Sequence, residues 1–412
     1  MTSPVASSSW RQGFRALHHR DFRIFLIGQM VSLSGSWMQG LAQSWLIYRL
    51  THSTFLMGTL GFCTHIPVLL LSPIGGIAAD RFSRRRLVIL SQFAFLAQAS
   101  TLAYLTLTDR ITVPYLLALA TLFGIVSAFE IPARQSLYVL MVGQRDLSNA
   151  IALNSMTFNA ARLVGPPIAG FILAAFGEGI CFLVNALTFL AVIGSLFLIS
   201  PSEPSREVTC SALSHIREGF TYAWDNREVR LLLGVTALVN LAGSPVILLG
   251  PVFADAIFHQ GSQGLGFLTG ALGLGAVLGT IILARQTGTS SMARTVLVSA
   301  LTMSLGLTVF AISPSFPLSL LAVGLVGFSI FRQLAATNTL IQTLIQDDYR
   351  GRTMAIYSMM VIGMLPLGNL ASGAAAEQIG ARATVFCGAI LALGAAAVLR
   401  IWAGYRFRKP LA

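Results

Sequence analysis

The chain has 412 residues, of which 55% are hydrophobic and only 10% are charged, and its formal net charge is +12. Soluble domains carry roughly 25% charged residues, so this composition cannot cover a water-facing surface, whereas a lipid-facing surface needs almost no charge. The basic residues stand in short clusters between apolar stretches, as in loops on one side of a membrane. We therefore expect an integral membrane protein surrounded by a lipid bilayer and exclude nucleic acid as its partner.

Twelve segments are long and apolar enough to cross a bilayer, for which a helix needs about 20 mostly apolar residues. The predicted spans are residues 24–48, 55–79, 87–107, 113–138, 148–176, 178–199, 229–254, 262–284, 294–312, 316–345, 352–378 and 383–404. The fourth, fifth, tenth and eleventh spans contain charged or amide side chains. The pattern predicts an all-α membrane protein with 12 transmembrane helices.

The Lys and Arg residues predict the orientation of these spans. If the N-terminus is cytoplasmic, 21 of the 27 basic residues fall in cytoplasmic segments, three (Arg134, Arg162 and Arg332) fall within spans, and only Arg49, Arg110 and Arg382 fall on the outer side. Both termini are therefore predicted to be cytoplasmic, and the arginine-rich first 23 residues do not read as a cleavable signal peptide. The chain divides into an N-terminal bundle (1–199), a cytoplasmic linker with an interfacial helix at Leu213–Trp224 (200–228) and a C-terminal bundle (229–412).

The two halves repeat each other. A shift of 203 residues superposes eight glycine pairs: Gly40 and Gly243, Gly58 and Gly261, Gly61 and Gly264, Gly76 and Gly279, Gly124 and Gly327, Gly165 and Gly368, Gly170 and Gly373, and Gly177 and Gly380. Six spans return the chain to its starting side, so both halves have the same orientation. The repeat predicts two parallel six-helix bundles related by a pseudo-twofold axis along the membrane normal, with a binding site between them near the midplane.

The loop between the second and third spans reads Gly-Gly-Ile-Ala-Ala-Asp-Arg-Phe-Ser-Arg-Arg-Arg over residues 75–86. It resembles the loop motif Gly-x-x-x-Asp-Arg-x-Gly-Arg-Arg of the major facilitator superfamily, with Ser83 where that family usually has glycine. The matching residues are Gly76, Asp80, Arg81, Arg84 and Arg85. The resemblance implies a cytoplasmic gate in which the aspartate pairs with arginine or caps a helix N-terminus. The alternative is that the arginines only fix the topology. The second-half counterpart lacks the aspartate, so the gate is expected to be one-sided.

The fifth span reads Ala-Arg-Leu-Val-Gly-Pro-Pro-Ile-Ala-Gly over residues 161–170. Through Gly165, Pro166 and Gly170 it resembles the glycine-proline motif of drug/proton antiporters in the same superfamily, although a simple packing kink explains it equally well. The wider pattern at 14–23, 34–39, 132–136, 149–154 and, more weakly, 349–354 resembles the bacterial branch that holds enterobactin-type siderophore exporters and macrolide-type efflux proteins. That resemblance implies proton-coupled export of a small amphipathic molecule across the bacterial inner membrane by alternating access.

Ionisable groups inside a membrane are costly and therefore candidates for function. Glu130 is the carboxylate that lies well within a predicted span, and it is our candidate for proton coupling; the alternative is a structural pair with Arg134 one turn along. Arg162 and Arg332 lie within the fifth and tenth spans. They can bind an anionic or oxygen-rich substrate, or else hold helices together.

Polar residues along several spans complete the candidate cavity. In the first span, Ser32, Ser36, Gln39 and Gln43 share one helical face, which must be turned toward protein or a cavity. The full candidate set is Gln29, Ser32, Ser36, Gln39, Gln43, Asn154, Asn159, Arg162, Asn240, Arg332, Gln333 and Asn338. The seventh span, the counterpart of the first, is mostly apolar. We therefore expect a cavity with one polar and one apolar wall, which suits an amphipathic substrate better than a sugar.

Several motifs are absent from the sequence. It has no P-loop, no zinc or hydrolase motif and no CxxC among its four cysteines, so we expect no ATP drive, no enzyme activity, no cofactor or metal and no disulfide. The acidic residues near span ends, Asp255, Asp347, Asp348 and Glu377, are expected to be solvated. The partners expected are a small molecule and protons, with a monomer as the default state. The alternatives are an importer on the same fold and a membrane scaffold or sensor that has lost transport.

Overall fold

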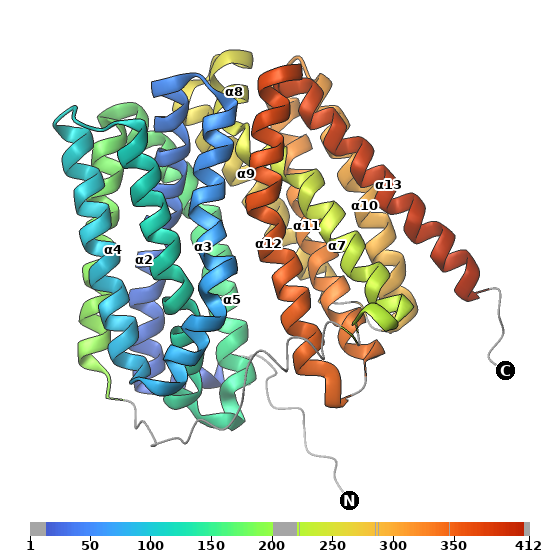
Figure 1. Ribbon diagram of the computed structural model, residues 1–412, viewed down its shortest axis with the longest axis horizontal. Coiled ribbons are helices and arrows are strands. Elements are labelled where there is room, and N and C mark those ends of the chain that lie inside the picture. The colour runs from blue at the N-terminus through green and yellow to red at the C-terminus, as the bar shows by residue number, and fades with distance from the viewer. Residues whose placement is uncertain are drawn as a thin grey trace, which may run out of the picture.

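A computed structural model describes residues 14–200, 221, 223–284, 286, 288–345 and 347–407. These residues fold into long helices that stand side by side (Figure 1). The first half contains the 3-10 helix η1 (Arg15–His18), α2 (Arg20–Thr51), α3 (Thr54–Arg81), α4 (Arg84–Leu107) and α5 (Val113–Leu198). The second half contains α7 (Arg227–Leu248), α8 (Gly250–Val252), the π-helix η2 (Phe253–Ile257), α9 (Gly261–Leu283), α10 (Thr289–Ile312), α11 (Phe316–Leu344), α12 (Asp347–Ile379) and α13 (Ala381–Phe407). Most of the predicted linker lies outside the described residues.

The 86-residue element α5 is not one straight helix, because Gly143 and Gly177 interrupt it with positive φ angles of 71° and 79°. Residues with a Cβ rarely adopt this backbone conformation. Asp146, just after the first break, contacts His19 at the start of α2, whereas Glu178, just after the second, contacts Arg49 at its end. The chain therefore crosses the bundle between the two breaks.

The outer surface of the bundle is apolar, as expected for a protein in a membrane. Many large apolar side chains lie on the outer surface of the bundle. More than half of the surface is exposed in, for example, Leu70, Leu90, Phe176 and Leu321. Nine of the described helices are long and apolar enough to cross a membrane, if α5 is counted as one. The polar helix α2 is not among the nine. The all-helical fold predicted from the sequence is confirmed.

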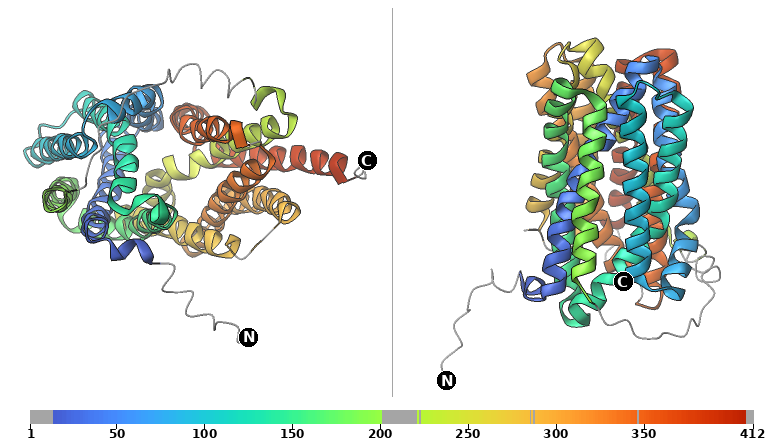
Figure 2. Two further views of the ribbon diagram at one scale, coloured as in Figure 1. Left: turned by 90° about the horizontal axis from the view of Figure 1, so that it is seen from below. Right: turned by 90° about the vertical axis from the view of Figure 1, so that its left-hand side faces the viewer.

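The two halves of the chain lie beside each other, with η1 to α5 on one side and α7 to α13 on the other (Figures 1 and 2). Two pairs of helices join them, since α3 packs against α12 and α5 packs against α9. The junction between α3 and α4, which carries the gate motif, lies at one end of the molecule, together with the start of α2 (Figure 1). We call this the gate-motif end; the α2–α3 and α12–α13 turns lie at the opposite end.

Candidate functional site

A cavity of about 580 Å³ lies between the two halves. From the first half, α2, α3, α4 and α5 line it, and from the second half α7, α8, α9, α10, α11 and α12 contribute. The five candidates predicted in the first span, Gln29, Ser32, Ser36, Gln39 and Gln43, are all part of its lining. The polar stripe therefore faces a cavity rather than lipid.

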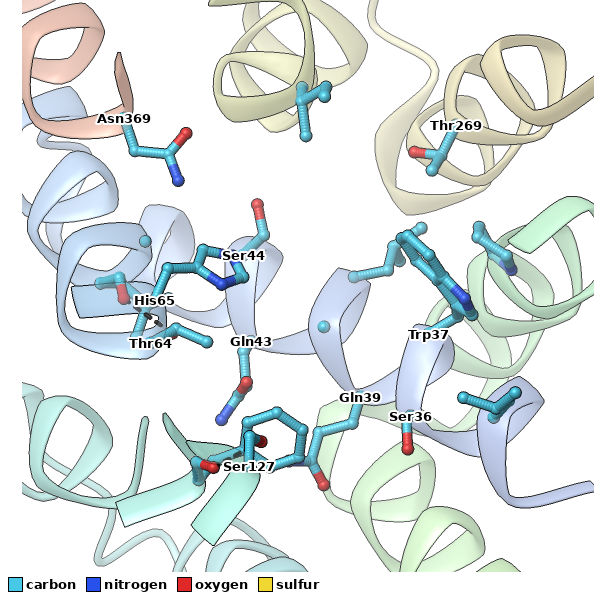
Figure 3. Close-up of a pocket in the computed structure, with 18 of the residues that line it drawn as sticks. Ser36, Trp37, Gln39, Gln43, Ser44, Thr64, His65, Ser127, Thr269 and Asn369 are labelled. Carbon is cyan, nitrogen blue, oxygen red and sulfur yellow. Dashed lines mark hydrogen bonds between the residues drawn. The ribbon is translucent and has the colours of Figure 1, made fainter. Parts of the chain in front are cut away.

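The two walls of the cavity differ in chemistry. The first half supplies amide, hydroxyl, imidazole and charged groups, including those of Gln92, Ser127 and His65. The second half supplies mostly aliphatic and aromatic side chains, with Thr269 and Asn369 as its polar members. In Figure 3 these two face Gln43 and Gln39 across the open space. The polar groups of the lining are thus concentrated in the first half, as expected, but that half also supplies apolar side chains such as Trp37 and Phe95.

Glu130 and Arg134 both line the cavity and form an ion pair one helical turn apart, with Arg134 Nε donating to Glu130 Oε1 at 2.7 Å. Both side chains are largely buried. Arg134 also donates to the hydroxyl of Tyr138 at 2.9 Å, and this hydroxyl donates to Asn154 Oδ1 at 2.6 Å. The pair predicted as the structural alternative therefore exists, and it lies at the wall of the cavity.

Gln39 has a role different from that of its neighbours on the stripe. Its Nε2 donates to Gln98 Oε1 at 3.1 Å, and its Oε1 accepts from Asn185 at 2.7 Å. Gln98 in turn donates to the backbone of Leu119. This chain of amides links α2, α4 and α5. The amide of Gln39 is therefore hydrogen-bonded within the first half, although the residue lines the cavity.

The other predicted cavity residues do not line this cavity. Arg162 is 4% exposed, lies 3.6 Å from the ring centre of Phe331 in the second half, and donates to Asn159 at 2.7 Å. Arg332 lies over the ring of Phe328. The amides Asn154, Asn159, Asn240 and Asn338 form hydrogen bonds within the protein, and Gln333 is buried in the second half. Arg162 thus bridges the halves by a cation–π contact.

The gate motif is only partly engaged in this structure. Asp80 and Arg81 are exposed, and Asp80 makes no ion pair with any residue that the structure describes. Arg85 Nε donates to the carbonyl of Leu196 at 2.9 Å, within the first half. Ser83, where the family usually has glycine, caps α4 by accepting from the backbone of Arg86 at 3.3 Å.

The antiporter-like motif lies where helices meet. A Cβ atom on Gly165 would lie 2.8 Å from the carbonyl oxygen of Ser34 on α2, and one on Gly170 would lie 3.0 Å from the Cα of Gly266 on α9. Pro166 lines the cavity. Gly165 therefore packs within the first half, and Gly170 packs the two halves against each other.

Glu377 is exposed, as expected, but it also fastens the two halves together. From α12 it accepts hydrogen bonds from Thr54 Oγ1 at 2.9 Å, the backbone of Phe55 at 3.1 Å and Ser53 Oγ at 3.2 Å, all at the N-terminus of α3. A carboxylate at a helix N-terminus is favoured by the free N–H groups and by the helix dipole. Glu377 thus caps α3 from the other half at the opposite end.

Sequence reasoning missed several polar residues of the lining: Ser44, Thr64, His65, Gln92, Ser127, Thr269 and Asn369. It also missed the contact that Glu377 makes with α3. His65 shares a helical face with Gly61, Thr64 and Val68, all of which line the cavity, and this spacing is a signal that could have found it. Thr269, Asn369 and Glu377 are isolated polar residues on apolar or glycine-rich helices of the second half. Their positions became visible only once the halves were brought together.

The two helical bundles lie on either side of a cavity that has a buried ion pair at its wall, an arrangement that suits the passage of a small molecule between them. The sequence matches the MFS_3 family, described as transmembrane secretion effector, over residues 11–408, so the chain belongs to this family of major facilitator transporters. The superfamily predicted from the loop motif is thereby confirmed.

Comparisons with individual proteins agree with this assignment. The chain is 26% identical to the staphyloferrin A transporter of Staphylococcus aureus (strain NCTC 8325 / PS 47), over 87% of this chain and 90% of that protein. It is also 26% identical to the multidrug efflux pump Tap of Mycolicibacterium fortuitum, over 88% and 90%. Its fold resembles a bacterial homologue of the iron transporter ferroportin in an inward-facing state, with a TM-score of 0.73, 18% identity and coverage of 93% and 98%.

Proposed function

We propose that this transporter exports a small amphipathic molecule from the bacterial cytoplasm in exchange for protons. The observation that carries the proposal is the Glu130–Arg134 ion pair at the wall of a cavity between the two halves. Protonation of Glu130 removes one charge of the pair and frees Arg134 to change partners. A group of this kind can link proton binding to a change of state, because buried charges are costly when they are unpaired.

Alternating access between two related bundles is the motion that we propose. Counting α5 as the three segments separated by Gly143 and Gly177, and adding α2, turns the nine helices into the twelve predicted spans. The proposed units are residues 1–199, the linker 200–228 and residues 229–412. The pseudo-twofold relation is supported by Gly177 and Gly380, a predicted repeat pair in which both residues have positive φ, 79° and 84°.

The contacts between the halves support the same symmetry. Gly170 and Gly373 are a repeat pair, and each approaches a glycine of the other half. Gly170 on α5 meets Gly266 on α9, and Gly373 on α12 meets Gly58 on α3. Repeat-related helices therefore make reciprocal contacts, as a pseudo-twofold axis requires. Bundles joined in this way can rock about the shared contacts.

The direction of transport rests on the relatives, of which one is named a multidrug efflux pump. The positive-inside pattern supports cytoplasmic termini and a gate motif on the cytoplasmic side. Gly76, Asp80, Arg81, Arg84 and Arg85 would then form the gate, and a monomer is sufficient because one chain encloses the cavity. Import on the same fold is the alternative that the experiment below separates from export.

The test is the accumulation of a fluorescent amphipathic dye in cells that carry the wild type or Glu130→Gln, with and without a protonophore. We expect the wild type to lower accumulation, the protonophore to abolish this effect, and Glu130→Gln to reduce proton-driven export by at least about tenfold. Removing one partner of a buried ion pair costs about 3–5 kcal/mol, which exceeds the roughly 1.4 kcal/mol that corresponds to a factor of ten.

The matched control is Glu178→Gln, because Glu178 is also a buried carboxylate paired with an arginine, Arg49, but does not line the cavity. We expect this variant to export normally once its amount in the membrane is matched. Equal export by Glu130→Gln and wild type would remove Glu130 from coupling. Higher accumulation in wild-type cells than in empty cells would favour import, and equal accumulation would favour a scaffold.

A further inference from the structure

The charge of the cavity limits what it can hold. Among the described residues that line it, the charged side chains of this state are Glu130 and Arg134, and their ion pair neutralises both charges. Arg162 and Arg332, the two other arginines within the predicted spans, do not reach the lining. An ion transferred from water into such a site loses hydration and gains no opposite charge, so its binding is unfavourable.

Three amides of the polar wall have atoms without a partner. Gln29 Oε1, Gln43 Nε2 and Gln92 Oε1 are buried and form no hydrogen bond with the protein. Their side chains are only 3% to 8% exposed, and all three line the cavity. An unpaired buried polar atom is unfavourable, so these amides are poised to bind a ligand that supplies the missing donors and acceptors.

Two of these amides, Gln29 and Gln43, lie at different depths along the cavity. Gln29 and Gln43 are fourteen residues apart on α2, which corresponds to about 21 Å along a helix axis. Gln43 lies on the wall that faces Asn369 and Thr269 of the second half (Figure 3). The apolar side chains Leu268, Leu272 and Phe310 belong to the same second-half wall. A ligand at this level meets the amide of Gln43 on one side, and on the other it meets hydrocarbon together with the polar groups of Asn369 and Thr269.

We infer that the substrate is an electrically neutral amphipathic molecule with amide or hydroxyl groups, which Gln43 and Gln92 bind by hydrogen bonds. This inference rests on the proposed function, because it takes this cavity as the substrate site. While the Glu130–Arg134 pair is intact, the described lining offers no free cation to a polycarboxylate and no free carboxylate to a permanent cation.

The test compares three probes that share one scaffold: dansyl-phenylalanine amide, dansyl-phenylalanine and the quaternary-ammonium amide of dansyl-phenylalanine. They are neutral, anionic and cationic at pH 7. Binding to the purified full-length protein in detergent is followed by dansyl fluorescence. We expect the neutral amide to bind saturably and at least about tenfold more tightly than either charged probe.

Substitutions of single amides test which residues bind the neutral probe. Gln43→Met and Gln92→Met remove the amide while keeping the approximate shape, so each is expected to weaken binding of the neutral probe by about three- to tenfold. Their thermal stability should stay the same or rise, because an unpaired polar atom is removed. Gln333→Met is the control: both of its amide atoms are buried and unpaired too, but it lies outside the cavity. It should leave binding unchanged.

Any of three results would overturn the inference. A charged probe could bind as tightly as the neutral amide or more tightly, the neutral amide could fail to bind saturably, or both Gln43→Met and Gln92→Met could keep full affinity. Binding is measured without a proton gradient, so the proposed export is judged separately. A protein that binds the neutral amide but does not move any probe in vesicles would contradict export and leave the inference standing. A protein that exports the anionic probe would support export and contradict the inference that the substrate is neutral.

Discussion

The two ends of the interface between the halves are in opposite states. At the end with the α2–α3 and α12–α13 turns, Glu377 of α12 caps the N-terminus of α3. The glycine pairs Gly58–Gly373 and Gly170–Gly266 also bring backbones of the two halves into close contact there. At the gate-motif end, Asp80 has the same type of side chain near a helix terminus but makes no ion pair among the described residues.

This difference shows how a rocking transporter can select one state. A carboxylate that caps a helix of the other half adds charge-assisted hydrogen bonds only while the halves are close at that end. Two such carboxylates at opposite ends cannot both be engaged if the halves rock as rigid bodies. Engagement of Glu377 and release of Asp80 are therefore expected to occur together.

The largest effect is expected from Gly170→Leu. A Cβ at this position would already lie 3.0 Å from Gly266 Cα and from Ser262 O, so a leucine must push α5 away from α9. We expect transport of the dye to be lost while the protein remains in the membrane. The measurement is dye efflux normalised to the amount of protein. Gly194→Leu, also on α5, is the control because no atom lies within 4 Å of a Cβ there; equal loss in both variants would contradict the role of the contact.

The next largest effect is expected from Glu377→Ala. It removes the acceptor of three hydrogen bonds across the halves, and since a hydrogen bond to a charged group contributes about 1.5–3 kcal/mol, a shift of at least about tenfold toward the state open at this end is expected. Spin labels on the exposed positions Phe55 of α3 and Ile379 of α12 can report this shift as a longer distance.

Asp80→Ala is the matched control for this experiment, because Asp80 is a carboxylate near a helix end without an ion pair in this state. It should leave the distance between the labels unchanged or favour the present state. An unchanged distance in Glu377→Ala would mean that the glycine contacts alone hold this end closed. Glu377→Gln should lie between wild type and Glu377→Ala, because it keeps the acceptor oxygen and loses the charge.

The sequence predicted the helices well and the contacts between halves poorly. The predicted span 262–284 corresponds to α9 at Gly261–Leu283, and 316–345 corresponds to α11 at Phe316–Leu344. Span length is set locally by hydrophobicity and bilayer thickness, so a local pattern is enough to find it. The polar stripe of α2 was found for the same reason, since helical periodicity alone places Ser32, Ser36, Gln39 and Gln43 on one face.

Glu377 and Arg162 show what a local pattern cannot supply. Glu377 looks like an ordinary residue at a span end until α12 is placed against the start of α3. Arg162 looks like a substrate ligand until Phe331 of the other half covers its guanidinium. Both roles depend on residues about 170 or more positions away in the chain, which no periodicity connects. The roles predicted for the gate motif and for Glu130 stay predictions.

The smallest effect is expected at the gate-motif end, from Ser83. Its hydroxyl caps the backbone N–H of Arg86 at the start of α4, within a single half. Loss of such a cap lowers the free energy of unfolding by about 1 kcal/mol in Ser83→Ala and by only a few tenths in Ser83→Gly, the residue that the family motif usually has. Thermal unfolding in detergent measures both. Because the cap does not join the halves, neither variant should change the distance between labels at Phe55 and Ile379. A change in that distance would mean that the start of α4 takes part in gating, and that the two ends differ less than their contacts indicate.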